Sequence, residues 1–312
     1  LDDLRSFRQW GSPAAGHPEY GEAPGIETTT GPLGQGVANG AGMALAERWL
    51  RERFGEALTD HFTYVLCGDG CLMEGISNEA ASLAGHLGLG RLIVLYDDNR
   101  ITIDGSTDIA FTEDVGARFS ALGWHVVHTD GHDHDAIGAA IDQAREETGR
   151  PTLIACRTVI AHGAPNLAGS NKSHGAPLGE AEVAATKAAL GLDPDATFVV
   201  PDEVVAHVRA RDRQRSAERA AWEARLGEHP RGDEWRRFHA PPDLSAVRWP
   251  EFDPADTGKL ATRKASQQVL QAVGAALGNL IGGSADLAGS NGSILAGEGE
   301  LSPEDFGGRN IH

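Results

Sequence analysis

One stretch of the sequence decides the fold: Gly68-Asp69-Gly70-Cys71-Leu72-Met73-Glu74-Gly75. It follows residues 62–67, an apolar run whose β-branched and aromatic side chains are typical of a buried strand. Gly68 and Gly70 leave the backbone free to turn and let a ligand approach it closely. A helical pattern follows over about residues 76–87. This order predicts a strand, a tight loop and a helix, the repeating unit of α/β proteins.

A second apolar run, residues 92–96, ends at Asp97-Asp98-Asn99. Because open α/β sheets bind ligands at the carboxyl ends of their parallel strands, we expect Asp69 and Asn99 to lie side by side. Carboxylate and amide oxygens are hard ligands, and Mg²⁺ takes one or two of them together with water and phosphate oxygens. A lone Gly-Asp-Gly is usually an ordinary turn. Its place at one strand end, about thirty residues before an Asn at the next, predicts a cation site.

Helical and extended patterns alternate over residues 112–157. We expect helices at 113–122 and 133–147, and strands at 124–129 and 152–156. Such alternation is typical of crossover units. The predicted fold class is therefore α/β, with a doubly wound, mainly parallel sheet and helices on both faces.

Composition limits the function classes. The chain of 312 residues has length for about two domains. Its 45 acidic and 27 basic residues give a net charge of −18, and the lack of a basic block argues against a nucleic-acid partner. The spacing of Cys67, Cys71 and Cys156 fits neither a zinc site nor a disulfide framework, which favours a reducing compartment. We expect a cytoplasmic protein without a membrane partner, because neither a spanning apolar run nor a signal peptide is visible.

The chain divides by composition after the last expected strand. Residues 158–180 form a Gly/Ala/Asn/Ser/His loop, and loops of that length are usually functional or disordered. A polar helix is expected at 201–227, then a Pro- and Trp-rich linker at 230–254. An amphipathic helix is expected at about 261–277, near the start of a second domain. The predicted domain boundaries are 1–195 for the first domain, 196–256 for a helical linker and 257–312 for the start of a second domain.

Several motifs along the chain are similar to those of transketolases. They are Gly16-His17-Pro18-Glu19, residues 29–36, residues 69–79, residues 101–105 and residues 174–179. The resemblance covers nearly the whole chain apart from roughly 200–255. It implies a thiamine diphosphate (PP) binding domain at 1–195 and a truncated start of a pyrimidine (Pyr) binding domain at 257–312. The implied cofactors are thiamine diphosphate and Mg²⁺, with Ca²⁺ or Mn²⁺ as possible replacements.

The implied reaction is transketolase chemistry in the pentose phosphate pathway. A two-carbon ketol unit would pass from a ketose phosphate, such as xylulose 5-phosphate, to an aldose phosphate, such as ribose 5-phosphate or erythrose 4-phosphate. Two alternatives stay open. The chain could belong to a dihydroxyacetone synthase or another thiamine enzyme, or it could be a non-catalytic cofactor-binding or dimerisation fragment.

The resemblance also implies which residues bind the cofactor. The metal ligands are Asp69, Asn99 and, through its backbone carbonyl, Ile101. Cofactor contacts are assigned to Gly31, Leu33, Gly68, Asp69, Gly70, Glu74, Asn99, Ile101, His174 and Asp286. Glu74 and Glu79 would join a carboxylate network at a dimer interface, although an acidic first helical turn is the simpler interpretation.

Catalytic and substrate roles are implied for a second group of residues. The resemblance implies that His17 and His174 are catalytic and bind the substrate. It also implies that Arg263 and Ser290 hold the phosphate group of the substrate, a role that suits the bidentate guanidinium. Without the resemblance, His17 would be a solvated loop residue and Arg263 a surface arginine. His162 is expected at the surface, and the histidines at 128, 132 and 134 lack the spacing of a metal site.

We expect the active protein to be a homodimer that binds sugar phosphates. Both ends of the chain look cut, and in transketolases the glutamate that activates the aminopyrimidine lies just beyond the segment that ends at His312. The 312 residues alone are therefore expected to be inactive.

Overall fold

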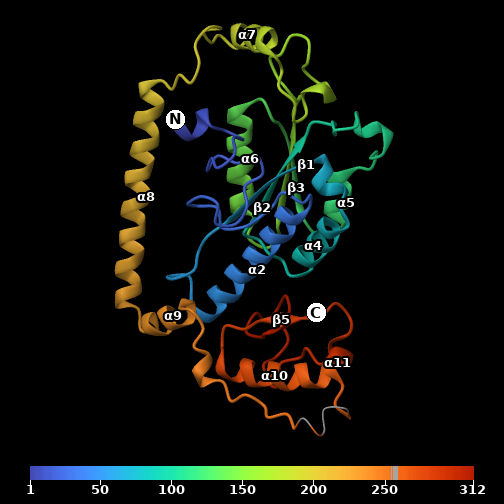
Figure 1. Cartoon of the computed structure of the whole chain (residues 1–312), viewed down its shortest axis with the longest axis vertical. Coiled ribbons are helices and arrows are strands. Elements are labelled where there is room, and N and C mark those ends of the chain that lie inside the picture. Colours follow the sequence, from blue (N-terminus) through green and yellow to red (C-terminus); the bar gives the residue numbers. More distant parts are fainter. Residues whose placement is uncertain (254, 256–258) are drawn as a thin grey trace. The chain divides into compact units, whose positions relative to one another are not determined.

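The computed structural model describes residues 1–253, 255 and 259–312 (Figure 1). These residues form two compact units. The first consists of Leu1–Ala46 and His61–Arg211, and the second of Glu47–Asp60 and Asp212–His312. The predicted domain boundaries at 195/196 and 256/257 stay predictions, and the second of them falls on residues outside the described ones.

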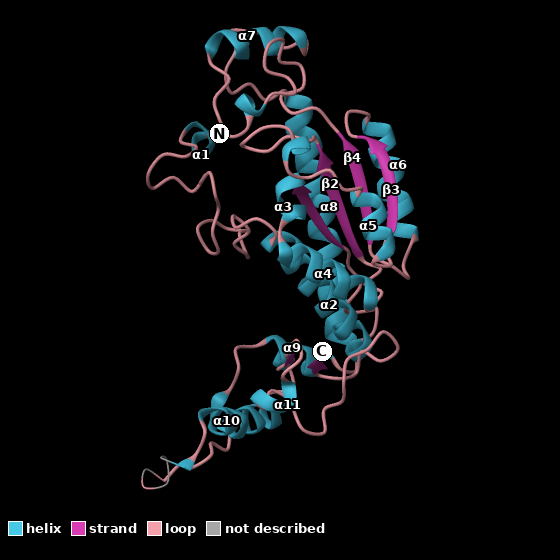
Figure 2. Ribbon diagram, turned by 90° about the vertical axis from the view of Figure 1, so that its right-hand side faces the viewer, coloured by secondary structure: helices cyan, strands magenta, loops and turns pink. Residues whose placement is uncertain are grey.

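The described residues of the first unit form a sheet of four parallel strands (Figure 2). The strands are β1 (Thr63–Gly68), β2 (Leu92–Asp98), β3 (His125–Asp130) and β4 (Thr152–Arg157), in the order β1-β2-β4-β3. Each lies within two residues of the run predicted for it. The predicted parallel α/β sheet is thus confirmed.

Helices cover both faces of this sheet. On one face, α6 (His134–Glu146) packs Ala140 and Ala144 against strand residues that include Ile93 and Ile154. On the other face, α2 (Gln35–Phe54) approaches β1 so closely that a Cβ at Gly40 would lie 2.3 Å from Val65 Cγ2. The chain crosses the sheet in one direction from β1 through β2 to β3 and then turns back to β4. Because crossovers are right-handed, the connection from β3 to β4 lies on the opposite face from the earlier ones. The sheet is therefore doubly wound.

The centre of the sheet is buried from both sides. Ile93 and Val94 are adjacent in β2, point to opposite faces, and are both 0% exposed. This two-sided burial explains why the strands are continuous apolar runs without alternation. Asp97 and Asp98 at the end of β2 and Asp69 directly after β1 bring carboxylates to the carboxyl edge of the sheet, where the candidate site lies.

Shorter elements complete the first unit. They are α1 (Asp2–Arg5), α3 (Asp69–Met73), α4 (Gly75–His86), α5 (Val115–Ala121), α7 (Glu180–Ala189) and two 3₁₀ turns, η1 (Thr107–Ile109) and η2 (Asn171–Ser173), among the described residues. Helix α7 was not expected from the sequence. It begins directly after Gly179, whose φ of 86° ends the preceding loop.

The second unit is built on aromatic packing. Its elements are the C-terminal parts of α2 and of α8 (Asp202–Glu228), α9 (Gly232–His239), η3 (Leu244–Ala246), α10 (Thr262–Ala276), α11 (Ala288–Asn291), and the parallel pair β5 (Gly282–Gly283) and β6 (Asn310–Ile311). The ring of Phe54 meets Trp235 and Phe238 edge-on, at centroid distances of 5.0 and 5.3 Å. The Pro- and Trp-rich segment predicted as linker therefore contains a packed helix, α9. Among the described residues, no helix has the length and apolar character needed to cross a membrane.

Candidate cation and cofactor site

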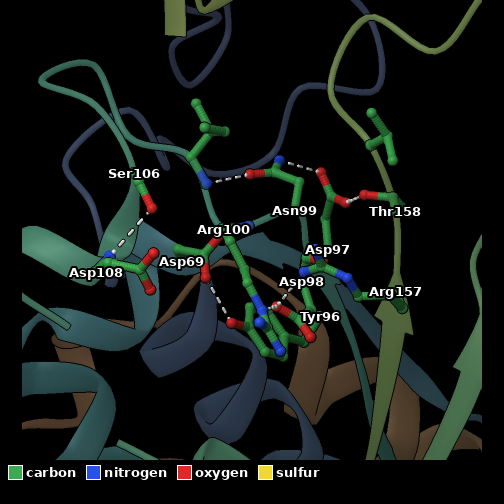
Figure 3. Close-up of polar contacts among 12 residues, drawn as sticks. Asp69, Tyr96, Asp97, Asp98, Asn99, Arg100, Ser106, Asp108, Arg157 and Thr158 are labelled. Atoms are coloured by element: carbon green, nitrogen blue, oxygen red, sulfur yellow. Dashed lines mark hydrogen bonds and ion pairs between the residues drawn. The ribbon is translucent and has the colours of Figure 1, made fainter. Parts of the chain in front are cut away.

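Asp69 is the first residue after β1 and is only 3% exposed. Its Oδ1 accepts a hydrogen bond from the Tyr96 hydroxyl at 2.6 Å, and its Oδ2 accepts one from the Arg100 backbone N–H at 3.1 Å (Figure 3). Both donors are uncharged. Burial raises the pKa of the Asp69 carboxyl, and the nearby carboxylates of Asp98 and Asp97 raise it further.

Asn99 follows β2 and meets the Asp69 loop at the same edge of the sheet. Strand pairing places Gly68 level with Asp97, so the residues that follow each strand come together. Asn99 Oδ1 accepts from the Ile101 N–H, and Asn99 Nδ2 donates to Asp97 Oδ2, both at 2.9 Å. This register supports the prediction that Asp69 and Asn99 lie side by side.

The turn after Asn99 is made by Arg100. Its φ of 60° is a left-handed conformation that few non-glycine residues adopt. This conformation directs the Arg100 N–H to Asp69 and leads into an antiparallel bridge between Ile101 and Ser106. The strained residue thus lies where the two strand-end loops are tied together.

These residues suit a small divalent cation. A buried carboxylate that receives only neutral hydrogen bonds carries an uncompensated charge, and a bound cation would offset it. The carboxylate of Asp69, the amide oxygen of Asn99 and the carbonyl of Ile101 are hard donors, to which phosphate and water oxygens would be added. Across the described ranges, no group of three or more His, Cys, Asp or Glu is arranged to hold a metal, the histidines at 128, 132 and 134 included.

The turn at residues 31–36 packs directly on this edge. Gly34 has a φ of 84°, and a Cβ there would lie 2.7 Å from Ile76 Cγ2 at the start of α4. A Cβ on Gly70 would lie 3.2 Å from Leu33 Cδ1. Leu33 nevertheless remains 53% exposed, so an apolar side chain beside Asp69 is available to a ligand.

The expectation that Gly68 and Gly70 free the backbone to turn was wrong, whereas the close approach of a ligand to them stays a prediction. Gly68 has φ −109° and ψ −175°, an extended conformation open to any residue, and Gly70 lies inside α3. Neither is needed for a left-handed turn. Gly70 instead gives Leu33 room to approach.

The two histidines of the prediction lie on exposed loops of the first unit. His17 is next to the glycine turn, since a Cβ on Gly31 would lie 3.9 Å from His17 Cδ2. His174 follows η2, where Asn171 Nδ2 donates to the Ile103 carbonyl at 3.1 Å. This bond brings the His174 loop against the loop that follows Asn99.

His162 is exposed, as expected, but it has a partner. Its ring stacks on His132 at a centroid distance of 4.0 Å, and His132 Nε2 accepts the Val159 N–H at 2.9 Å. These contacts hold the first residues of the His174 loop.

The remaining predicted residues belong to the second unit. Arg263 is the second residue of α10, and Asp286 and Ser290 lie before and within α11. All three side chains are exposed. The two helices pack together, because a Cβ on Gly292 would lie 2.8 Å from Gln267 Cβ.

Sequence reasoning missed the polar groups that contact Asp69 and Asn99 or hold those contacts in place. Tyr96 was read as the last apolar residue of its strand, and Asp97 and Thr158 received no role. A cavity of about 470 Å³ also borders Asp69 at the ends of β2, β3 and β4. It is lined by side chains that include Tyr96, Asp98, Arg100, Asp108, Asp114 and His128. The sequence feature that could have indicated this cavity is the high density of acidic residues over 97–114.

Comparison with known proteins agrees with this geometry. The family model of the transketolase thiamine diphosphate binding domain matches residues 1–235. The transketolase of Cereibacter sphaeroides is 52% identical over 100% of this chain and 48% of the relative. A structure of transketolase from Leishmania mexicana matches with a TM-score of 0.92 and 42% identity, covering 99% of this chain and 48% of that one. A Pichia stipitis transketolase mutant in complex with xylulose-5-phosphate matches with a TM-score of 0.91 and 41% identity, at the same coverage of 99% and 48%.

The parallel sheet and the Asp69 edge therefore belong to a thiamine diphosphate binding domain. The chain is a member of the transketolase family. It spans about half the length of the curated relatives it matches.

Proposed function

We propose that the Asp69 edge binds the divalent cation and diphosphate of thiamine diphosphate. Asp69 and Asn99 would supply side-chain ligands and Ile101 its backbone carbonyl, to Mg²⁺ or, in its place, Ca²⁺ or Mn²⁺. The observation that carries the proposal is the buried Asp69 carboxylate, which receives only neutral hydrogen bonds at the ends of two parallel strands. Cation binding there would relieve the charge that burial disfavours.

The surrounding residues would cradle the organic part of the cofactor. Leu33 would pack against the pyrimidine ring, and the Gly31 carbonyl would accept a hydrogen bond from the ring amine. The backbone at Gly68 and Gly70 would approach the diphosphate. Glu74, His174 and Asp286 complete the proposed set of cofactor contacts. When bound, thiamine diphosphate supplies the electron sink that carbanion chemistry needs. The chain's own residues would bind it, orient it and exclude water.

The proposed reaction is transfer of a two-carbon ketol unit between sugar phosphates. The Pichia stipitis relative was solved with xylulose-5-phosphate, which supports a ketose phosphate as donor. His17 and His174 would contact the reacting end of the sugar, because both lie on loops that touch the cofactor edge. Arg263 and Ser290 would hold the phosphate, since a guanidinium fork suits its oxygens.

Further properties of the family are proposed on the same basis. The first domain, 1–195, would bind the diphosphate, 196–256 would be the linker, and 257–312 would open the pyrimidine-binding domain. The active protein would be a homodimer with sites completed across the interface. A cytoplasmic location is proposed as well, supported by the free thiols of Cys67, Cys71 and Cys156.

The test is an activity assay on this chain joined to the remaining half of the Cereibacter sphaeroides relative. We expect ketol transfer from xylulose 5-phosphate to ribose 5-phosphate that depends on thiamine diphosphate and Mg²⁺. Preference for formaldehyde as acceptor would instead indicate a dihydroxyacetone synthase. A folded, cofactor-binding protein that transfers no ketol unit would contradict the proposed activity.

A further inference from the structure

Asp97 contacts two parts of the site that are far apart in sequence. Its Oδ2 accepts a hydrogen bond from Asn99 Nδ2 at 2.9 Å, and its Oδ1 accepts one from the Thr158 hydroxyl. Figure 3 shows Asp97 between these two partners. Thr158 is the first residue after β4 and begins the loop that carries His174.

The chemistry of these contacts fixes the orientation of the Asn99 amide. An ionised carboxylate only accepts hydrogen bonds, so the amide group that faces Asp97 has to be the NH₂. The amide oxygen is thereby turned to the opposite side, where one lone pair accepts the Ile101 N–H and the other remains. An amide that rotated by half a turn would present NH₂ where the cation ligand is needed.

We propose that Asp97 is a positioning residue for the cation site, which orients Asn99 Oδ1 and is itself held by Thr158. This inference rests on the proposed cation and cofactor site. Groups that orient metal ligands through hydrogen bonds commonly contribute about 10- to 100-fold to metal affinity. Asp97 touches neither cation nor substrate in this account and acts through Asn99.

The same contact couples the cation site to the His174 loop. Thr158 binds Asp97, and the next residue, Val159, donates its N–H to His132. A displacement of Asp97 would therefore shift the start of the loop as well as the amide of Asn99. Cation binding and the position of this loop should be linked in both directions.

Asp98 provides a matched control one residue away. Its carboxylate pairs with Arg157 at 3.2 Å and with Arg100 at 3.7 Å, and Asn99 is not its partner. Removal of Asp98 takes away the same charge near the cation site without freeing the Asn99 amide. The two positions thus separate an orienting role from simple electrostatic attraction.

The experiment measures Mg²⁺ and Ca²⁺ affinity by calorimetry at saturating thiamine diphosphate, on the chain joined to the remaining half of the Cereibacter sphaeroides relative. Asp97→Ala should weaken Mg²⁺ binding about 10- to 100-fold. Asp98→Ala should cost only a few-fold. Asp97→Asn should lie between them, because its amide oxygen can still accept from Asn99 Nδ2 although the charge is gone.

Two further readouts separate orientation from loss of fold. Thr158→Val keeps size and charge, and should still weaken Mg²⁺ binding measurably. Mg²⁺ demands stricter octahedral geometry than Ca²⁺, so Asp97→Ala should weaken Mg²⁺ more than Ca²⁺. Circular dichroism and the melting temperature report whether each variant is folded.

The outcomes distinguish this inference from the proposed function. If the parent binds Mg²⁺ with thiamine diphosphate but Asp97→Ala, Asp97→Asn and Asp98→Ala weaken it equally, and Thr158→Val is silent, Asp97 acts by charge alone and the inference is wrong. If the folded parent does not bind the pair at all, the proposed cofactor site itself is wrong, and the inference falls with it.

Discussion

The Asp69 edge and the α10–α11 segment each carry some of the predicted site residues, and they differ in how far those residues are buried and held by hydrogen bonds. Asp69 is 3% exposed and held by Tyr96 and Arg100. Arg263 and Ser290 are exposed side chains on helix ends. The first region has its geometry fixed by strand register and buried hydrogen bonds. In the second region, the side chains proposed to bind the substrate's phosphate lie exposed on helices α10 and α11.

This difference predicts how substitutions should behave. A change at the Asp69 edge removes a ligand from a preformed site and should act on binding of the cofactor. A change at α10 or α11 should leave the cofactor bound and affect substrate choice.

The largest effect is expected from Asp69→Ala. Loss of the charged ligand should abolish Mg²⁺-dependent binding of thiamine diphosphate by calorimetry, with circular dichroism near that of the parent. Asn99→Ala should cause a smaller loss, because an amide ligand carries no charge. Asp142→Ala, on the exposed side of α6, serves as the control with full binding. Retained binding in Asp69→Ala would remove Asp69 from the site.

An equally large loss is expected when residues 1–312 are tested by themselves. Residues 1–312 alone should show no rapid proton exchange at C2 of thiamine diphosphate, because the proposed activating carboxylate is supplied by a fuller pyrimidine domain of a second subunit. The chimera with the remaining half of the relative should exchange rapidly and sediment as a dimer in analytical ultracentrifugation. Rapid exchange in the 312-residue chain, or a fully active monomeric chimera, would overturn the shared-site account.

Arg263→Ala sharpens the contrast between the regions. A hydrogen bond to a charged group contributes about 1.5–3 kcal/mol, so kcat/KM for phosphorylated over unphosphorylated sugars should fall roughly 10- to 100-fold. Thiamine diphosphate affinity should stay at the parental value. Lys264→Ala, the neighbouring exposed cation, is the control. An equal loss for both kinds of sugar would exclude a phosphate role for Arg263.

His174→Ala is expected to have a moderate effect. The His174 side chain is exposed, so the loss should lie at the lower end of the range for a hydrogen bond to a charged group, about ten-fold in kcat/KM. His162→Ala should be close to silent in the same assay, because the His132 contact to the Val159 N–H and the Asn171 contact to Ile103 hold the loop without it. The reverse ranking would mean that the two histidines of this loop have been assigned to the wrong roles.

The smallest effect is on stability. Burial raises the pKa of Asp69 above its unfolded value, so the folded chain binds more protons than the unfolded chain between the two pKa values. This contribution makes the free energy of unfolding fall as pH rises from about 4 through the folded-state pKa. Without a cation, the melting temperature of Asp69→Asn should therefore show a weaker decline with pH than that of the parent. Identical pH slopes would mean that Asp69 does not carry an uncompensated charge.

Sequence reasoning correctly predicted the structural elements that depend on the local sequence. The strand runs before Asp69 and Asn99, and the parallel register between them, follow from apolar composition and short crossovers. The contact from Thr158 to Asp97 spans 61 residues and exists only because β4 inserts between β2 and β3. That strand order cannot be read from a pattern. The Tyr96 bond to Asp69 was hidden for another reason, since a tyrosine ring in an apolar run looks like core until its hydroxyl is placed.

The most direct test of the central claim is a crystal structure of the chimera with thiamine diphosphate and Mn²⁺, read through the anomalous scattering of the metal. We expect a single strong peak in contact with the Asp69 carboxylate, Asn99 Oδ1 and the Ile101 carbonyl. A peak held instead by Asp98, Asp108 and Asp114 in the neighbouring cavity, with Asn99 unligated, would contradict it.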